Sequence, residues 1–181
     1  MSSYSVSAYA PGTAVHGALL HAASLGFYTG LQGPQASCPL PASECPPVVG
    51  TLVRGDMDSM SVVVPGGQSI YVPADGQVKY IMPHSGFTPP GSLLGCFIKK
   101  TVRSQTSDCI TPMELEVDDF NDGNGHIGLA LCPDLPKEMV GTEASFVLYA
   151  KTADFNLTDC TDLEGLTLTP SEATVGAFQY W

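Results

Sequence analysis

The sequence predicts a single all-β domain that is cross-linked by disulfides. Three observations indicate this class: short apolar or β-branched runs recur at close intervals, 19 Gly and 15 Pro residues are spread along the chain, and six cysteines are present. Because Gly and Pro mark turns and interrupt long helices, frequent short strands are expected. A length of 181 residues suits one domain, and we assign residues 1–181 to it.

About twelve short strands are expected. The first is the alternating run from Tyr4 to Ala10. The strongest hairpin signal is Asp75-Gly76, which separates the apolar run at 69–73 from the one at 78–81. The remaining strands are expected within residues 15–23, 26–31, 48–54, 60–65, 93–102, 113–117, 127–131, 146–150 and 175–180.

Twelve strands without helices are compatible with a closed barrel or a β-sandwich. We favour a trefoil-like barrel, made of three four-strand units, slightly over a sandwich, although the sequence contains no clear internal repeat. One alternative to a strand stays open at residues 14–25, whose Ala and Leu content is also compatible with a short helix, although Gly12 and Gly17 lie near its start and Gly26 at its end. Residues 32–47 are rich in Pro, Gly, Ser and Cys and are expected to form a loop.

The charge of the chain disfavours nucleic acid and membranes as partners. Seven Lys and Arg residues against 18 Asp and Glu residues give a formal net charge of −11. A surface of that sign repels phosphate backbones and anionic headgroups. No run of about 18 apolar residues is long enough to span a bilayer. No signal peptide is recognised, and we expect that a leader has been removed from a secreted chain.

The cysteines indicate disulfides rather than a metal site. They are Cys38, Cys45, Cys96, Cys109, Cys132 and Cys160. None forms a Cys-x-x-Cys pair, and the four histidines, which are His16, His21, His84 and His126, do not complete a ligand pattern. We therefore expect no metal and no cofactor. Local loop closure favours the pairings 38–45, 96–109 and 132–160.

No catalytic motif is recognised. The acidic stretch from Asp118 to His126 lacks the glycine that a calcium-binding loop beginning at Asp119 would need at its sixth position, so a polar hairpin turn is expected there. Gly67-Gln68-Ser69 lacks the second glycine of a nucleophile elbow, and His84 is expected to be a loop histidine rather than a base. Two carboxylates across a cleft leave no sequence signature, so glycoside hydrolysis stays open.

The triplet Asn156-Leu157-Thr158 is an acceptor for an N-linked glycan. It lies in a polar segment just before Cys160. We therefore expect the native host to attach a glycan to Asn156.

Several segments resemble a family of small secreted fungal proteins. The most specific segment is Val64-Pro65-Gly66-Gly67-Gln68-Ser69-Ile70-Tyr71-Val72-Pro73-Ala74-Asp75-Gly76, and the others are His84-Ser85, Pro89-Pro90-Gly91-Ser92, Leu129-Ala130-Leu131-Cys132-Pro133, Ala177-Phe178-Gln179-Tyr180-Trp181 and the region from Tyr4 to Leu31. They are similar to IgE-binding proteins, or allergens, that are related to a cell-wall protein needed for phialide development. The resemblance covers most of the chain. It includes four of the cysteines, while Cys96 and Cys109 look like an additional pair.

The resemblance implies a secreted or cell-wall-associated, allergen-like protein. Because no catalytic motif is recognised and a glycan acceptor is present, we expect a glycoprotein that is not an enzyme, with a role in wall or conidiophore development. Its expected partners are cell-wall polysaccharide and host IgE. The alternative is an extracellular carbohydrate-binding module or a small glycoside hydrolase. Trp181 is the only tryptophan, which disfavours a sugar-binding surface built from several stacked aromatic rings.

Overall fold

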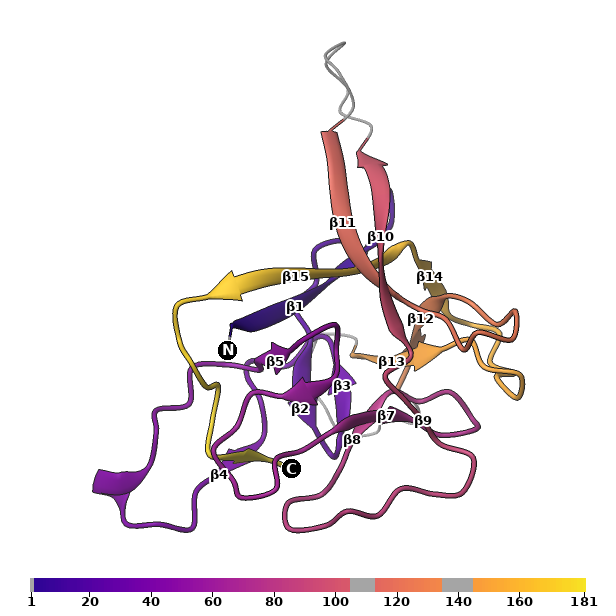
Figure 1. Cartoon of the computed structure of the whole chain (residues 1–181). Coiled ribbons are helices and arrows are strands. Elements are labelled where there is room, and N and C mark those ends of the chain that lie inside the picture. The colour runs from indigo at the N-terminus through magenta and orange to yellow at the C-terminus, as the bar shows by residue number, and fades with distance from the viewer. Residues whose placement is uncertain (1, 105–112, 135–144) are drawn as a thin grey trace.

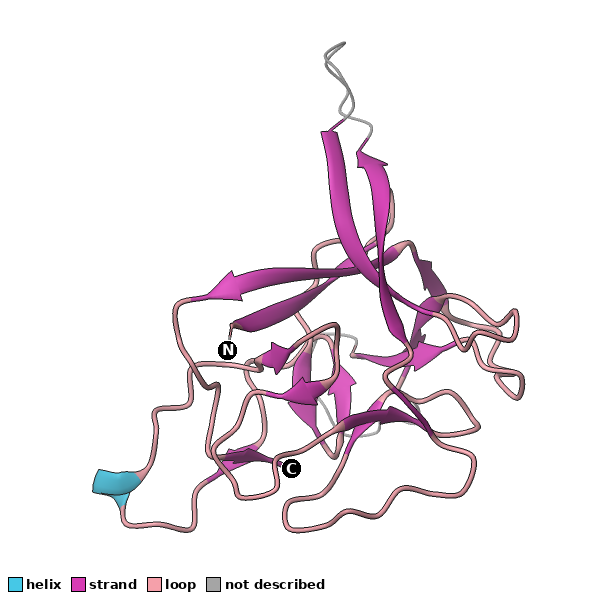
Figure 2. Cartoon of the chain, viewed as in Figure 1, coloured by secondary structure: helices cyan, strands magenta, loops and turns pink. Residues whose placement is uncertain are grey.

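The computed structural model describes residues 2–104, 113–134 and 145–181. In this part of the chain it contains sixteen β-strands and one short 3-10 helix, η1 (Ala42–Glu44), and the predicted all-β class is confirmed (Figures 1 and 2). The strands form curled antiparallel sheets that make a half-barrel. The domain is therefore closer to the expected barrel than to two flat sheets packed face to face.

Two large sheets and one small sheet contain these strands. The first has the order β10 (Phe97–Ser104), β11 (Met113–Phe120), β15 (Gly165–Ser171), β1 (Ser3–Tyr9), β5 (Val53–Arg54), β6 (Ser59–Met60). The second has the order β14 (Thr161–Leu163), β12 (Leu129–Pro133), β13 (Phe146–Ala150), β3 (Gly26–Tyr28), β8 (Lys79–Tyr80), β7 (Ile70–Val72), β9 (Leu93–Leu94), and β2 (His21–Ala23) also pairs with β3. The third pairs β16 (Gln179–Tyr180) with β4 (Ala36–Ser37). This order does not divide into the three equal units of a trefoil.

The core between the sheets is built around buried aromatic side chains. The ring of Tyr80 lies edge-on to Phe27 at 5.6 Å and to Tyr180 at 6.3 Å between centroids. Both tyrosine hydroxyls find partners: that of Tyr80 donates to the carbonyl oxygen of Trp181 at 2.7 Å, and that of Tyr180 donates to the carbonyl oxygen of Gly50 at 2.6 Å. Because buried hydroxyls are costly without partners, these bonds fix the chain around Tyr180 against the core.

The Asp75-Gly76 hairpin is present, with Ile70 opposite Tyr80 in the β7–β8 pair. Gly76 has a φ of 92°, and a Cβ atom there would lie 2.2 Å from the carbonyl oxygen of Ala150. The amide of Ala150 donates to the carbonyl oxygen of Gly76 at 2.7 Å. Only glycine fits this turn, because it must adopt a left-handed conformation against the backbone of β13.

Some regions differ from the sequence-based expectation. The strand expected within residues 15–23 is limited to β2, which follows turns, and the helix considered as its alternative at residues 14–25 is not formed. The loop expected at residues 32–47 contains β4 and η1. Strands β14 and β15 were not predicted, and β15 pairs along its whole length with β1, from Ser3 opposite Ser171 to Tyr9 opposite Gly165. Strand β15 therefore lies inside the first sheet, between β1 and β11.

The β10–β11 hairpin projects from the body of the domain (Figure 1). At its base the buried rings of Phe97 and Phe120 pack edge-on with centroids 6.4 Å apart. Toward its outer end most side chains are exposed or half-buried, including Met113. The base of this hairpin forms one wall of the candidate site.

Candidate functional site

A pocket of about 640 Å³, lined mainly by polar and charged residues, lies where β1, the β5–β6 turn and β10 meet. Its lining residues are Ser2, Tyr4, Arg54, Gly55, Asp56, Asp58, Ser59 and Lys99. The pocket combines two cationic side chains, two carboxylates and one tyrosine ring. Residues of this kind can bind a polar ligand through several hydrogen bonds.

The β5–β6 turn places the two carboxylates. Gly55 and Met57 both have left-handed backbones, with φ of 60° and 55°, and the amide of Asp58 donates to the carbonyl oxygen of Arg54 at 3.0 Å. A Cβ atom on Gly55 would lie 2.1 Å from Oδ2 of Asp58. Glycine therefore lets the Asp58 carboxylate fold back over the turn. Met57 is buried and anchors the turn to the core.

Lys99 joins this turn to the β10–β11 hairpin. Its Nζ lies 2.5 Å from Oδ1 of Asp56 and 3.2 Å from Oδ1 of Asp118. One ammonium group therefore lies between two carboxylates from different parts of the chain. The hydrogen bond to Asp56 is the main reason that the pKa of Lys99 is raised. The ammonium form of Lys99 is thus favoured in the folded protein.

Asp118 is the most unusual of these groups. It is only 2% exposed, and within the described residues its Oδ2 has no hydrogen-bond partner. Burial raises the pKa of Asp118 above its ordinary value, Lys99 acts against this, and the charges of Asp56 and Asp58 add to the rise. A carboxyl group of this kind retains its proton to a higher pH than a surface aspartate.

A second lysine–aspartate pair lies beside it. Nζ of Lys100 lies 2.7 Å from Oδ2 of Asp119, whose side chain is also buried. Lys99 is directly opposite Asp118 in the antiparallel register, whereas Lys100 is opposite Val117 and reaches Asp119 diagonally. The structure corrects the expectation that the residues from Asp118 onward form a solvated turn. The first two are buried residues of β11, because a lysine of β10 neutralises each of them.

The turn itself is confined to the second half of the acidic stretch. Asn121 forms an isolated bridge with Ile127, and Oδ1 of Asp122 accepts hydrogen bonds from the amides of Asn124 at 2.7 Å and His126 at 3.1 Å. Nδ1 of His126 lies 2.6 Å from Oδ2 of Asp122. The carboxylate of Asp122 is thus occupied by its own turn. Within the described ranges no group of three or more His, Cys, Asp or Glu side chains is placed to hold a metal ion.

The two other residues considered for catalysis lie apart from this pocket. His84 is exposed at the third position of a turn closed by the amide of Ser85 and the carbonyl oxygen of Met82 at 3.1 Å, and its φ is 61°. Ser69 contributes its carbonyl oxygen to the amide of Ile81 at 2.9 Å. Neither residue lines the pocket beside Lys99.

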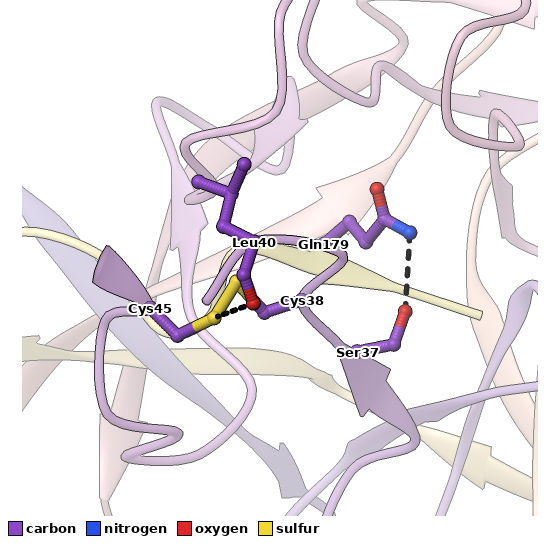
Figure 3. Close-up of a disulfide and its surroundings, with 5 residues drawn as sticks. All are labelled: Ser37, Cys38, Leu40, Cys45 and Gln179. Carbon is purple, nitrogen blue, oxygen red and sulfur yellow. Dashed lines mark hydrogen bonds between the residues drawn. A yellow bond between two sulfur atoms is a disulfide. The ribbon is translucent and has the colours of Figure 1, made fainter. Parts of the chain in front are cut away.

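Two of the expected disulfides are present. Cys38 and Cys45 close the loop after β4, with Cα atoms 6.0 Å apart (Figure 3). Beside this bond, Nε2 of Gln179 donates to Oγ of Ser37 at 3.1 Å, which joins β16 to β4. Cys132 and Cys160 are also bonded and have Cα atoms 4.1 Å apart.

The third expected bond, 96–109, is not formed, because Cys96 has a free and buried thiol. Cys109 lies outside the described residues. Cys96 lies at the base of the β10–β11 hairpin, directly before the pair of Phe97 with Phe120, and its side chain is buried there.

Asn156 lies exposed in the loop between β13 and β14. An acceptor for an N-linked glycan must be accessible in this way. Sequence reasoning did not identify Asp56, Asp58 and Lys99 as site residues. One signal was present in the sequence, since the basic doublet Lys99-Lys100 and the acidic doublet Asp118-Asp119 lie on two strands that pair, with Lys99 opposite Asp118. No local signal connects Asp56 to either doublet.

Comparisons with known proteins give one relative and no family. No family model and no solved structure matches the chain. An uncharacterized secreted protein of Arthroderma benhamiae is 28% identical over 162 residues, which cover 89% of this chain and 76% of the relative. Among the described residues, no helix has the length and hydropathy needed to cross a membrane. Together with the two disulfides, the similarity to a secreted fungal protein identifies this chain as a secreted protein.

Proposed function

We propose that this secreted protein is a non-catalytic component of the fungal wall or its surroundings and acts by binding. The observation that carries the proposal is the position of Lys99 Nζ, which contacts Asp56 at 2.5 Å and Asp118 at 3.2 Å. A pair of catalytic carboxylates must hold a substrate between them. Here an ammonium group occupies that place, and Asp118 is only 2% exposed.

The pocket chemistry supports wall polysaccharide as the partner. Arg54 and Lys99 offer donors, Asp56 and Asp58 offer acceptors, and Tyr4 offers a half-buried ring. A hydroxyl-rich chain can donate to the carboxylates and accept from the cations, while a ring stacks on a sugar face. The net charge of −11 favours a neutral or basic polysaccharide over an anionic one.

Co-sedimentation with insoluble β-glucan and with chitin tests this proposal. The Asp58→Asn variant removes one pocket carboxylate, and Asp154→Asn, at an exposed site outside the pocket, is the matched control. The wild-type protein and Asp154→Asn should bind at least one polymer equally, and Asp58→Asn should bind it several-fold less. Absence of wild-type binding to both polymers, or equal binding by Asp58→Asn, would contradict the proposed site.

The resemblance described above suggests a finer assignment, which we include in the proposal: an allergen-like protein with a role in conidiophore development. Serum IgE from sensitised patients should bind the oxidised protein, and reduction of the disulfides should weaken that binding by disrupting the loops they close. Deletion of the coding sequence in the source organism should alter phialide or wall morphology. Normal morphology together with no IgE binding would remove this assignment.

A second function has one specific observation in its favour. The raised pKa of Asp118 and the neighbouring carboxylate of Asp56 are features that a glycoside hydrolase uses for its acid and its second carboxylate. This alternative requires Lys99 to leave its present position when a sugar binds. An assay of polysaccharide hydrolysis by wild type, Asp56→Asn and Asp118→Asn separates the two functions.

A further inference from the structure

The triplet Asn156-Leu157-Thr158, which is a sequence acceptor for an N-linked glycan, is accessible at the surface of the folded domain. All three residues are exposed, and no hydrogen bond of the described residues engages the Asn156 amide or the Thr158 hydroxyl. The triplet lies between the turn after β13 and Cys160, which is tied to β12 by its disulfide. Both groups that an acceptor must offer are therefore free at the surface of the folded domain.

A small pocket lies directly beside the acceptor. It has a volume of about 170 Å³, and its lining residues are Cys132, Pro133, Asn156, Leu157, Thr158, Asp159 and Cys160. The Cys132–Cys160 disulfide and the triplet thus border the same hollow. Leu157 is 43% exposed at its edge, although it is an aliphatic side chain within a polar loop. A hollow of this volume is comparable in size to one sugar ring.

We propose that Asn156 carries an N-linked glycan whose first N-acetylglucosamine seats in this pocket, covers Leu157 and shields the Cys132–Cys160 disulfide. The attachment uses a lipid-pyrophosphate-linked oligosaccharide of the secretory pathway as donor. A bond forms between Nδ2 of Asn156 and the anomeric carbon of the first sugar, the bond from that carbon to the pyrophosphate oxygen breaks, and Nδ2 loses one proton. The lipid pyrophosphate leaves.

The apolar face of the first sugar matches the apolar side chains at the pocket. The ring face covers the side chain of Leu157 and the exposed ring of Pro133, while the hydroxyls stay in water. Cys132 is already buried and Cys160 is half-buried, so the sugar covers the remaining path by which a reductant reaches the bond. The inference is independent of the pocket beside Lys99 and goes beyond the proposed binding function.

The test uses the full chain secreted from a yeast host in three forms: with its complete glycan, trimmed by an endoglycosidase to a single N-acetylglucosamine, and fully deglycosylated by an amidase. Intact mass establishes occupancy, with Thr158→Ser as the variant that keeps the acceptor and Thr158→Ala as the one that removes it. The rate at which dithiothreitol reduces Cys132–Cys160 is then followed by peptide mapping. Cys38–Cys45 in the same molecule is the internal reference.

The complete and trimmed forms should be reduced equally slowly at Cys132–Cys160, and the deglycosylated form several-fold faster, because the first sugar no longer covers the path of the reductant to the sulfur atoms. The Asn156→Asp variant should match the deglycosylated form, because the amidase leaves aspartate. Leu157→Ser should keep the glycan and lose the protection. An unshifted mass would overturn the attachment. A trimmed form that is reduced as fast as the deglycosylated form would overturn the seating of the first sugar.

Discussion

Asp118 accepts a hydrogen bond of 3.2 Å from Lys99 through one carboxylate oxygen, while its other oxygen is buried and has no partner among the described residues. The same ammonium reaches Asp56 at 2.5 Å in the β5–β6 turn. A half-satisfied buried carboxylate is therefore held at the junction of a turn and a projecting hairpin. This arrangement determines both how the site responds to pH and whether it can act on a substrate.

The pKa shift of Asp118 makes one contribution to stability that is largest in acid. Burial raises its pKa above the ordinary value of 3.8, so this contribution is fully present below that value and is lost as the pH rises through the raised pKa. We expect Asp118→Asn to gain unfolding free energy relative to wild type as the pH rises from 3.5 to 6.5. Urea unfolding at several pH values measures this difference.

Asp122→Asn is the matched control for the pH experiment. Desolvation acts to raise the pKa of Asp122, but the hydrogen bonds from Asn124 and His126 outweigh it and lower the pKa. Its contribution is therefore present above 3.8 and lost as the pH falls, so Asp122→Asn should lose stability relative to wild type at the higher pH values. Two variants with the same pH trend would show that Asp118 is not buried as the structure has it.

Removal of the Lys99 ammonium should destabilise the domain. In Lys99→Met the buried carboxylate of Asp118 loses its only side-chain partner among the described residues, at a cost of about 1–3 kcal/mol. Lys151→Met removes a more exposed pair, at 2.6 Å from Asp162, and should cost less than about 1 kcal/mol. Chemical denaturation at pH 7 compares the two. Equal losses would mean that the Lys99 contacts contribute no more than a surface ion pair.

A methyl group at Gly76 should damage the fold more than one at Gly12. Both glycines have left-handed backbones, with φ of 92° and 81°, but only Gly76 would place a Cβ atom against the carbonyl oxygen of Ala150. We expect the free energy of unfolding to fall by about 1 kcal/mol in Gly12→Ala and by about 3 kcal/mol or more in Gly76→Ala. Thermal unfolding of both variants decides this, and similar losses would indicate that backbone conformation alone accounts for the cost.

The cysteines should differ in reactivity and in their effect on stability. Burial raises the pKa of the Cys96 thiol to about 11, so it should be alkylated only after the chain is unfolded. Replacement of Cys132 and Cys160 by serine should lower the free energy of unfolding by about 3.6 kcal/mol, and replacement of Cys38 and Cys45 should lower it by about 2.5 kcal/mol. The first loss is larger because the longer loop restricts the entropy of the unfolded chain more. Non-reducing peptide mapping that found Cys96 in a disulfide would contradict the structure.

Local signals in the sequence were sufficient for much of the fold. The Asp75-Gly76 hairpin was predictable because its turn residues and its flanking apolar runs lie within a dozen positions. Strand β15 was missed although Leu166 and Leu168 alternate with threonines, which is typical of a strand with one wet face. The pairing of β15 with β1 joins the two ends of the described chain, and no local pattern indicates such a partner.

The candidate site could not be predicted in the same way. Lys99 is 43 residues from Asp56 and 19 residues from Asp118, and only the register of β10 with β11 and the position of the β5–β6 turn bring them together. The disulfide expected between Cys96 and Cys109 was favoured by closeness in sequence alone. In the structure Cys96 has a free thiol that is buried at the base of the β10–β11 hairpin, and Cys109 lies outside the described residues.

Hydrolysis of cell-wall polysaccharides tests the central claim most directly. Purified wild-type protein, Asp56→Asn and Asp118→Asn are incubated with β-glucan and chitin from pH 3.5 to 6.5, and released reducing sugar is measured. If Lys99 occupies the space between the two carboxylates, as the structure has it, all three proteins should release no more sugar than a buffer blank. Turnover by wild type that either substitution abolishes would contradict a non-catalytic function and establish Asp56 and Asp118 as a catalytic pair.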